Sequence, residues 1–112
     1  MRPGIASLLV AALAACSSQA DKQLEAVKSA RSAIAEWALV EEQAAKGSAP
    51  STYVQQMRVL ARDQLKTAES ELSQQPDAAA LLDKLRSGSP DTAALKRAED
   101  ALKPLEDSLE AA

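Results

Sequence analysis

Apolar side chains recur every three or four residues along most of the chain, which is the spacing of one face of an α-helix. From about Asp21 to Lys46, this face consists of Leu24, Val27, Ala30, Ile34 and Trp37. From about Thr52 to Gln74, it consists of Val54, Met57, Ala61, Leu65, Ala68 and Leu72. This second set advances 18 residues in five steps, so its mean spacing matches the helical period of about 3.6. Both segments are predicted to be long helices.

Two more helices are predicted in the second half of the chain. A short one begins with Pro76 at its first position and ends before Gly88, and its apolar face consists of Leu81, Leu82 and Leu85. Ser89-Pro90-Asp91 repeats this start, and the last helix places Leu95, Ala98, Leu102, Leu105 and Leu109 on one face. Pro104 interrupts that helix, and we expect a kink or fraying there because proline lacks an amide donor and clashes with the carbonyl of Asp100.

Glycine and capping residues predict where the first helix ends and the second begins. Gly47 is expected to end the first helix, because glycine enters the left-handed conformation without steric cost. Thr52 and Gln55 have the spacing of a capping box at the start of the second helix. No alternating strand pattern is apparent. The predicted fold is therefore all-α, a small up-down helical bundle of three long helices plus one short helix, over residues 21–112.

The first sixteen residues have the composition of a targeting signal. Arg2 precedes a run from Ile5 to Ala15 that is apolar except for Ser7 and is too short for a permanent membrane span. Small residues end this run, as they do before the cleavage point of a secretory signal. Leu13-Ala14-Ala15-Cys16 resembles the lipobox of bacterial lipoproteins. An ordinary signal peptide with a chance cysteine, or a cysteine buried in an N-terminal helix, is the alternative.

The lipoprotein resemblance implies a membrane anchor at Cys16. In that family the cysteine thiol receives a diacylglycerol, the signal is cleaved just before it, and the new amine is usually acylated. Residues 1–15 would then be removed, and residues 16–20 would form the lipidated N-terminus and a short tether. Ser17 follows the cysteine where family members retained in the inner membrane have Asp. The implied location is thus the outer membrane, facing the periplasm.

Composition argues against most enzymes and against nucleic-acid binding. The chain has no His and one Cys, so it cannot assemble a triad with Ser/His or Cys/His, or a His- or Cys-rich zinc site. Its formal charge is −3, and no run of Lys and Arg exceeds two residues, which argues against a nucleic-acid partner. The adjacent acids Glu41 and Glu42 diverge on a helix. We therefore expect no catalytic residues, no cofactor and no metal site.

Aromatic side chains are the candidate contacts for a partner. Trp37 and Tyr53 are the only Trp and Tyr, and each either fills the bundle core or contacts a partner. Arg31 lies on the same face as Val27 and Ile34, where its charge could bind a ligand carboxylate. We expect instead that its stem lies along the core edge and its charged end reaches water.

After removal of residues 1–15, the chain has 20 alanines and 20 larger apolar side chains, which gives a thin core. These features predict a non-enzymatic envelope module that uses an exposed apolar groove between helices to bind another envelope protein or itself. The alternative is a periplasmic carrier of a small molecule or lipid.

Overall fold

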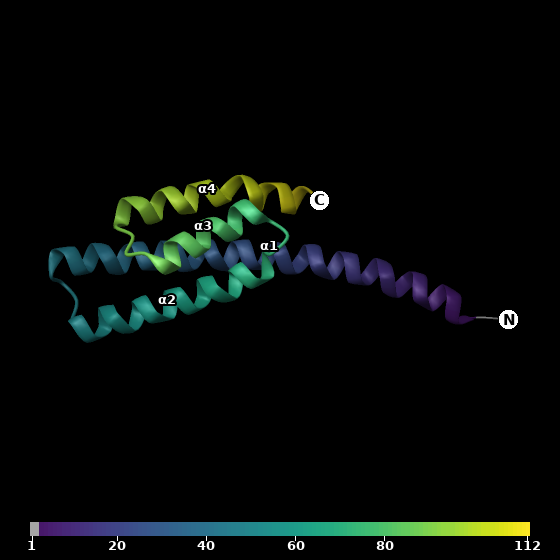
Figure 1. The fold of residues 1–112 in the computed structure, drawn as a ribbon, viewed down its shortest axis with the longest axis horizontal. Coiled ribbons are helices and arrows are strands. Elements are labelled where there is room, and N and C mark those ends of the chain that lie inside the picture. The colour runs from purple at the N-terminus through teal and green to yellow at the C-terminus, as the bar shows by residue number, and fades with distance from the viewer. Residues whose placement is uncertain (1–2) are drawn as a thin grey trace.

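Four helices make up the fold (Figure 1). The computed structural model describes the backbone of residues 3–112 and the side chains of residues 19–112. The helices are α1 (Pro3–Lys46), α2 (Ser51–Glu71), α3 (Pro76–Ser87) and α4 (Thr92–Ala111). No strand occurs in residues 3–112. The predicted all-α class, with three long helices and one short helix, is confirmed.

Helix α1 is longer than the predicted segment that starts near Asp21. Its 44 residues begin at Pro3, and its N-terminal part extends beyond the other helices (Figure 1). At about 1.5 Å per residue this helix sets the long dimension of the molecule, 71 Å. The side chain of Cys16 lies outside the described residues. In the part that the structure describes, no helix combines the length and the apolar character needed to cross a membrane.

The predicted end of α1 at Gly47 is confirmed. Gly47 has a positive φ of 66°, and its amide donates to the carbonyl of Ala44 at 3.1 Å. The amide of Ser48 donates to the carbonyl of Gln43 at 3.0 Å. This pair of bonds is the Schellman motif, which satisfies carbonyls that the last helical turn leaves free.

The predicted capping box of α2 is wrong. The helix begins at Ser51 with Pro50 as its N-cap, and no side chain caps it. Pro50 already has its ring-fixed φ of −61°, so the helix begins before Thr52, which lies inside the first turn and cannot cap it. The helix also ends earlier than Gln74, because Leu72 has left helical geometry with φ −102° and ψ 24°.

Helix α3 begins with Pro76 and carries Asp77 in its first turn, as predicted. Helix α4 does not begin with Pro90. Asp91 is its N-cap, and the Asp91 carboxylate accepts a hydrogen bond from the amide of Ala94 at 2.8 Å. The aspartate takes this position because its side chain can satisfy a free amide of the first turn, which proline cannot do.

The expected fraying after Pro104 is absent, since α4 continues to Ala111. Pro104 is exposed, so water can satisfy the carbonyl that its ring frees. Leu105 and Leu109 follow it and pack against the core. This packing holds the last turns of the helix in place.

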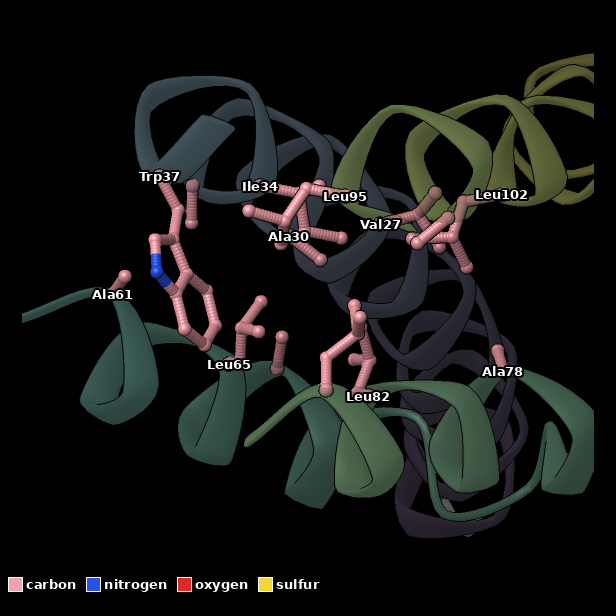
Figure 2. Close-up of a cluster of buried hydrophobic side chains, with 14 of the residues drawn as sticks. Val27, Ala30, Ile34, Trp37, Ala61, Leu65, Ala78, Leu82, Leu95 and Leu102 are labelled. Carbon is pink, nitrogen blue, oxygen red and sulfur yellow. The ribbon is translucent and has the colours of Figure 1, made fainter. Parts of the chain in front are cut away.

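All four helices contribute to one core (Figure 2). Helices α2 and α4 both pack along α1, and α3 packs on α2. Figure 2 shows Trp37 pointing from α1 toward α2, where Ala61 and Leu65 lie. The largest fully buried side chains are Val27, Ile34, Trp37, Leu65, Leu72, Leu82, Leu95 and Leu102. Among residues 19–112, Leu85 and eight alanines complete the core: Ala26, Ala30, Ala33, Ala38, Ala61, Ala68, Ala78 and Ala98.

Candidate functional site

A groove runs between α3 and α4, the two helices that contact each other least among the packed neighbours. It consists of two cavities of about 500 and 510 Å³. Leu81 and Ala101 line both cavities, so the two lie end to end between α3 and α4 and are together called the α3/α4 groove.

Apolar side chains make up most of the lining of the α3/α4 groove. Leu85, Ala98 and Leu102 form its floor and are buried. Leu81 and Leu105 are partly buried and pack against the core beside them. The remaining apolar lining residues are small or rigid: Ala78, Pro90, Ala94, Ala101 and Pro104. Such a lining leaves room for an apolar object to approach both helices.

Charges at the two ends of the α3/α4 groove have opposite sign. Lys84 and Arg97 line the end that includes the α3–α4 connection, and Asp77 lines the end at the start of α3. None of these three side chains has an ion-pair partner among the side chains of residues 19–112. The groove therefore presents free charge to an incoming molecule.

A second, polar cavity of about 290 Å³ lies beside Trp37 and the α3–α4 connection. The indole Nε1 of Trp37 donates to Glu41 Oε2 at 2.9 Å. Arg58 donates to the same carboxylate from Nε at 2.7 Å and from Nη2 at 2.8 Å. The guanidinium of Arg62 lies 5.1 Å from the centre of the Trp37 ring, within range of a cation–π contact, and donates to the carbonyl of Gly88 at 3.2 Å.

Electrostatics in this cavity favour a structural role. The hydrogen bonds from Arg58 are the main cause that lowers the pKa of Glu41, and the Trp37 indole adds to the effect. Glu41 in turn raises the pKa of Arg58. A carboxylate held ionised by a bidentate guanidinium is a poor general acid or base at neutral pH. The cluster of Trp37, Glu41, Arg58 and Arg62 instead joins α1, α2 and the α3–α4 connection.

The two aromatic candidates lie in different environments. Trp37 is 1% exposed, so in this conformation its ring fills the core and is not presented to a partner. Tyr53 is 44% exposed on the first turns of α2, where Val59 and Leu60 are exposed as well. Tyr53 lines neither the α3/α4 groove nor the polar cavity.

Arg31 was expected to reach water, and the structure pairs it with α4 instead. Its Nη1 lies 3.1 Å from Glu106 and its Nη2 lies 3.7 Å from Glu99. The side chain is 21% exposed. Sequence periodicity placed Arg31 beside the apolar face but could not show that two acids of a helix distant in sequence would meet it.

Acidic side chains form no free carboxylate cluster among the described residues. Carboxylate oxygens of Glu106, Asp107 and Glu110 lie within 4.8 Å of one another. Each of the three is paired with a cation: Glu106 with Arg31, Asp107 with Lys103, and Glu110 with Lys28. These contacts account for the cluster without an ion.

Sequence reasoning missed the Glu41–Arg58 pair and the identity of the helices that border the groove. The sequence signals only the Trp37–Glu41 contact, because Glu41 follows Trp37 by four residues and so lies on the same helix face; it does not relate Glu41 to Arg58 on the next helix. For the α3/α4 groove, the spacing of Leu81, Leu82 and Leu85 predicted the apolar face of α3 but did not identify α4 as the other border.

Comparisons of the chain with protein-family models, with curated proteins and with solved structures find no match.

Proposed function

We propose that this chain is a non-enzymatic, lipid-anchored binding module of the bacterial cell envelope, and that its α3/α4 groove holds an apolar surface of a protein partner. The observation that carries the proposal is the groove itself, which is mainly apolar and lies between two helices that make few contacts with each other. The partner is another envelope protein or a second copy of the chain.

Energetics support a partner at this position. Much of the core consists of alanine, which buries little area per residue. A helix laid against Leu81, Leu105 and the alanines of the groove would bury apolar surface that is now open. Recognition of this kind needs an apolar groove and matching side chains on the partner, with no reactive group. No catalytic residue, cofactor or metal is part of the proposed function.

The proposed anchor is the thiol of Cys16, on the sequence evidence of the lipobox-like residues Leu13-Ala14-Ala15-Cys16. Two or three acyl chains anchor a protein stably where one does not. With Ser17 after the cysteine, the proposed location is the outer membrane, facing the periplasm. We further propose that the four helices form an up-down bundle, with the α1–α2 connection at the end far from the anchor. Along α1, Lys46 lies about 45 Å beyond Cys16 at the helical rise.

Metabolic labelling with palmitate tests the anchor. The wild-type chain should incorporate label and migrate as the shorter, processed form, whereas Cys16→Ala should remain unlabelled. Cys16 is the only cysteine, so no other thiol can account for thioether-linked label. Equal labelling of the two proteins, or no labelling of either, contradicts the anchor.

Photo-crosslinking in intact cells tests the groove. A photoreactive amino acid at Ala94 or Ala101 is expected to form protein adducts, because both positions line the α3/α4 groove. Tyr53 is the informative comparison, since it is exposed and lies outside the groove. Adducts from Tyr53 but not from Ala94 or Ala101 would move the binding surface to α2, and the proposal for the groove would then be wrong.

The alternative function is a periplasmic carrier of a small molecule or lipid. The two cavities of about 500 and 510 Å³ favour it, because their combined volume suits a chain-like apolar ligand. Native mass spectrometry of the purified lipoprotein distinguishes the two functions. A carrier should retain a small ligand of defined mass, and a protein-binding module should not.

A further inference from the structure

We infer that the α3/α4 groove is occupied by the α3/α4 groove of a second copy of this chain, with α3 facing α3 and α4 facing α4 in antiparallel directions. This inference rests on the proposed function, in which the groove binds protein. It adds the identity of the partner and the geometry of the contact.

Charge selects both the partner and the orientation. Two copies can pack groove to groove about a two-fold axis that lies either along the groove or across it. An axis along the groove would place Lys84 against Arg97 of the partner subunit, which is repulsive. An axis across the groove reverses the helix directions and places Lys84 against Asp77 of the partner subunit. Because the contact is symmetric, this ion pair forms twice.

The residues at the middle of the groove are also compatible with a two-fold axis across it. Leu81 and Ala101 are the residues that both cavities share, so they mark its midpoint. Asp77 precedes Leu81 by four residues and Lys84 follows it by three, so the opposite charges lie at nearly equal distances along α3. A two-fold axis through Leu81 and Ala101 brings the charged ends of the two copies together. The small side chains of Ala94 and Ala101 let the α4 helices approach closely.

An anionic amphiphile fits the groove less well. Its head group would be attracted to Lys84 and Arg97, but its apolar tail would then end beside Asp77. A second copy places Asp77 against Lys84 at both ends of the groove, and Arg97 stays unpaired beside each of these pairs. The symmetric contact also covers partly buried Leu81 with Leu81 of the partner subunit.

Disulfide trapping in the native membrane tests the contact. With Cys16 acylated, a cysteine introduced by Ala101→Cys is the only free thiol, and mild oxidation should join two copies into a covalent dimer. A disulfide requires Cα atoms within about 7 Å, which the two-fold axis at Ala101 provides. Ser32→Cys is the matched control, because Ser32 is exposed on α1 and lines neither cavity of the groove. It should give no dimer above the level set by random collision.

A charge exchange tests the orientation with the full lipoprotein in detergent. Lys84→Asp places two acids opposite each other and should weaken dimerisation on the order of tenfold. Adding Asp77→Lys restores opposite charges and should recover most of the affinity. Far-UV circular dichroism and the fluorescence of Trp37 check that both variants fold. A double variant as weak as Lys84→Asp overturns this orientation.

The possible outcomes separate this inference from the proposed function. A dimer from Ala101→Cys, absent with Ser32→Cys, supports it. A photo-crosslink from position 101 to a different envelope protein, together with no disulfide-linked dimer from Ala101→Cys, overturns the self-association. The groove would then remain a surface that binds another protein. If no position in the groove gives any protein adduct, both the inference and the proposed binding function fail.

Discussion

Arg58 on α2 donates two hydrogen bonds to the carboxylate of Glu41 on α1, from Nε at 2.7 Å and from Nη2 at 2.8 Å. The two side chains are 28% and 15% exposed, so the pair is only partly open to water. It joins the first two helices near their connection and stands beside the buried ring of Trp37. Its two short bonds, each to a different carboxylate oxygen, make it a stronger contact than an exposed lysine pair such as Lys103–Asp107.

Removal of Arg58 should destabilise the fold. Arg58→Ala leaves Glu41 partly buried, with the Trp37 indole as its remaining hydrogen-bond donor, so we expect the free energy of unfolding to fall by about 1–3 kcal/mol. Urea denaturation followed by the fluorescence of Trp37, the only tryptophan, measures this change. Lys103→Ala is the control, because it removes an exposed pair with Asp107 and should cost less than about 1 kcal/mol. Equal losses of unfolding free energy for the two variants would show that the bidentate pair contributes no more stability than an exposed ion pair.

The same pair predicts a dependence of stability on pH. The pKa of Glu41 is lowered in the folded state, chiefly by its hydrogen bonds with Arg58, so the folded state binds a proton at Glu41 less readily than the unfolded state. The stability from this group is therefore present above the unfolded pKa, and it is lost as pH falls through the folded pKa. From about pH 5 downward, the unfolding free energy of the wild type should fall more steeply than that of Glu41→Gln.

Glu42→Gln provides the control for that pH dependence. Glu42 is adjacent in sequence, but its side chain is 41% exposed and pairs with Lys46 within α1. The Glu42→Gln variant should lose as much stability on acidification as the wild type does. If Glu41→Gln retains the full wild-type slope between about pH 5 and pH 3, the Glu41–Arg58 pair does not control the acid response.

Local chemistry predicted several helix boundaries correctly and others wrongly. Gly47 and Pro76 were placed correctly, since each residue type has a strong preference at one end of a helix. Thr52 was placed wrongly because two adjacent signals compete there, and Pro50 begins the helix before a threonine cap can form. At the start of α4, Pro90 and Asp91 compete in the same way, and Asp91 is the N-cap because its side chain accepts a hydrogen bond from the amide of Ala94.

Contacts between distant residues could not be predicted from periodicity. The 3.6-residue pattern identified Leu65 and Leu102 as core residues, because it depends only on the helix that carries them. It could not pair Arg31 with Glu106, which lies 75 residues away. An apolar groove between helices was predicted, but the two helices that border it were not. Their identity depends on how the four helices pack around one core, which the pattern within a single helix does not show.

The buried and exposed leucines should differ sharply in their contributions to stability. Leu82 is 0% exposed in the core, and Leu39 is 58% exposed on α1. We expect Leu82→Ala to lower the free energy of unfolding by about 2–5 kcal/mol, because the side chain leaves a cavity among helices that already pack through alanines. Leu39→Ala should change it by less than about 0.5 kcal/mol. Urea denaturation of both variants makes the comparison, and a large loss at Leu39 would indicate that this surface is buried by a partner.

Gly47 tests whether a single backbone conformation limits the stability of the α1–α2 connection. Its φ is +66°, and a Cβ added there would meet no atom within 4 Å, so any cost of a side chain comes from the backbone and not from crowding. Gly47→Ala should lower the free energy of unfolding by about 1–2 kcal/mol, since left-handed geometry strains L-residues with a Cβ. Gly47→Asn should cost less, because asparagine tolerates this conformation better than alanine. Thermal or urea unfolding of the three proteins would rank them glycine, asparagine, alanine. An alanine variant as stable as the wild type would show that the connection adopts another conformation at no cost, and the Schellman motif would then not be what ends α1.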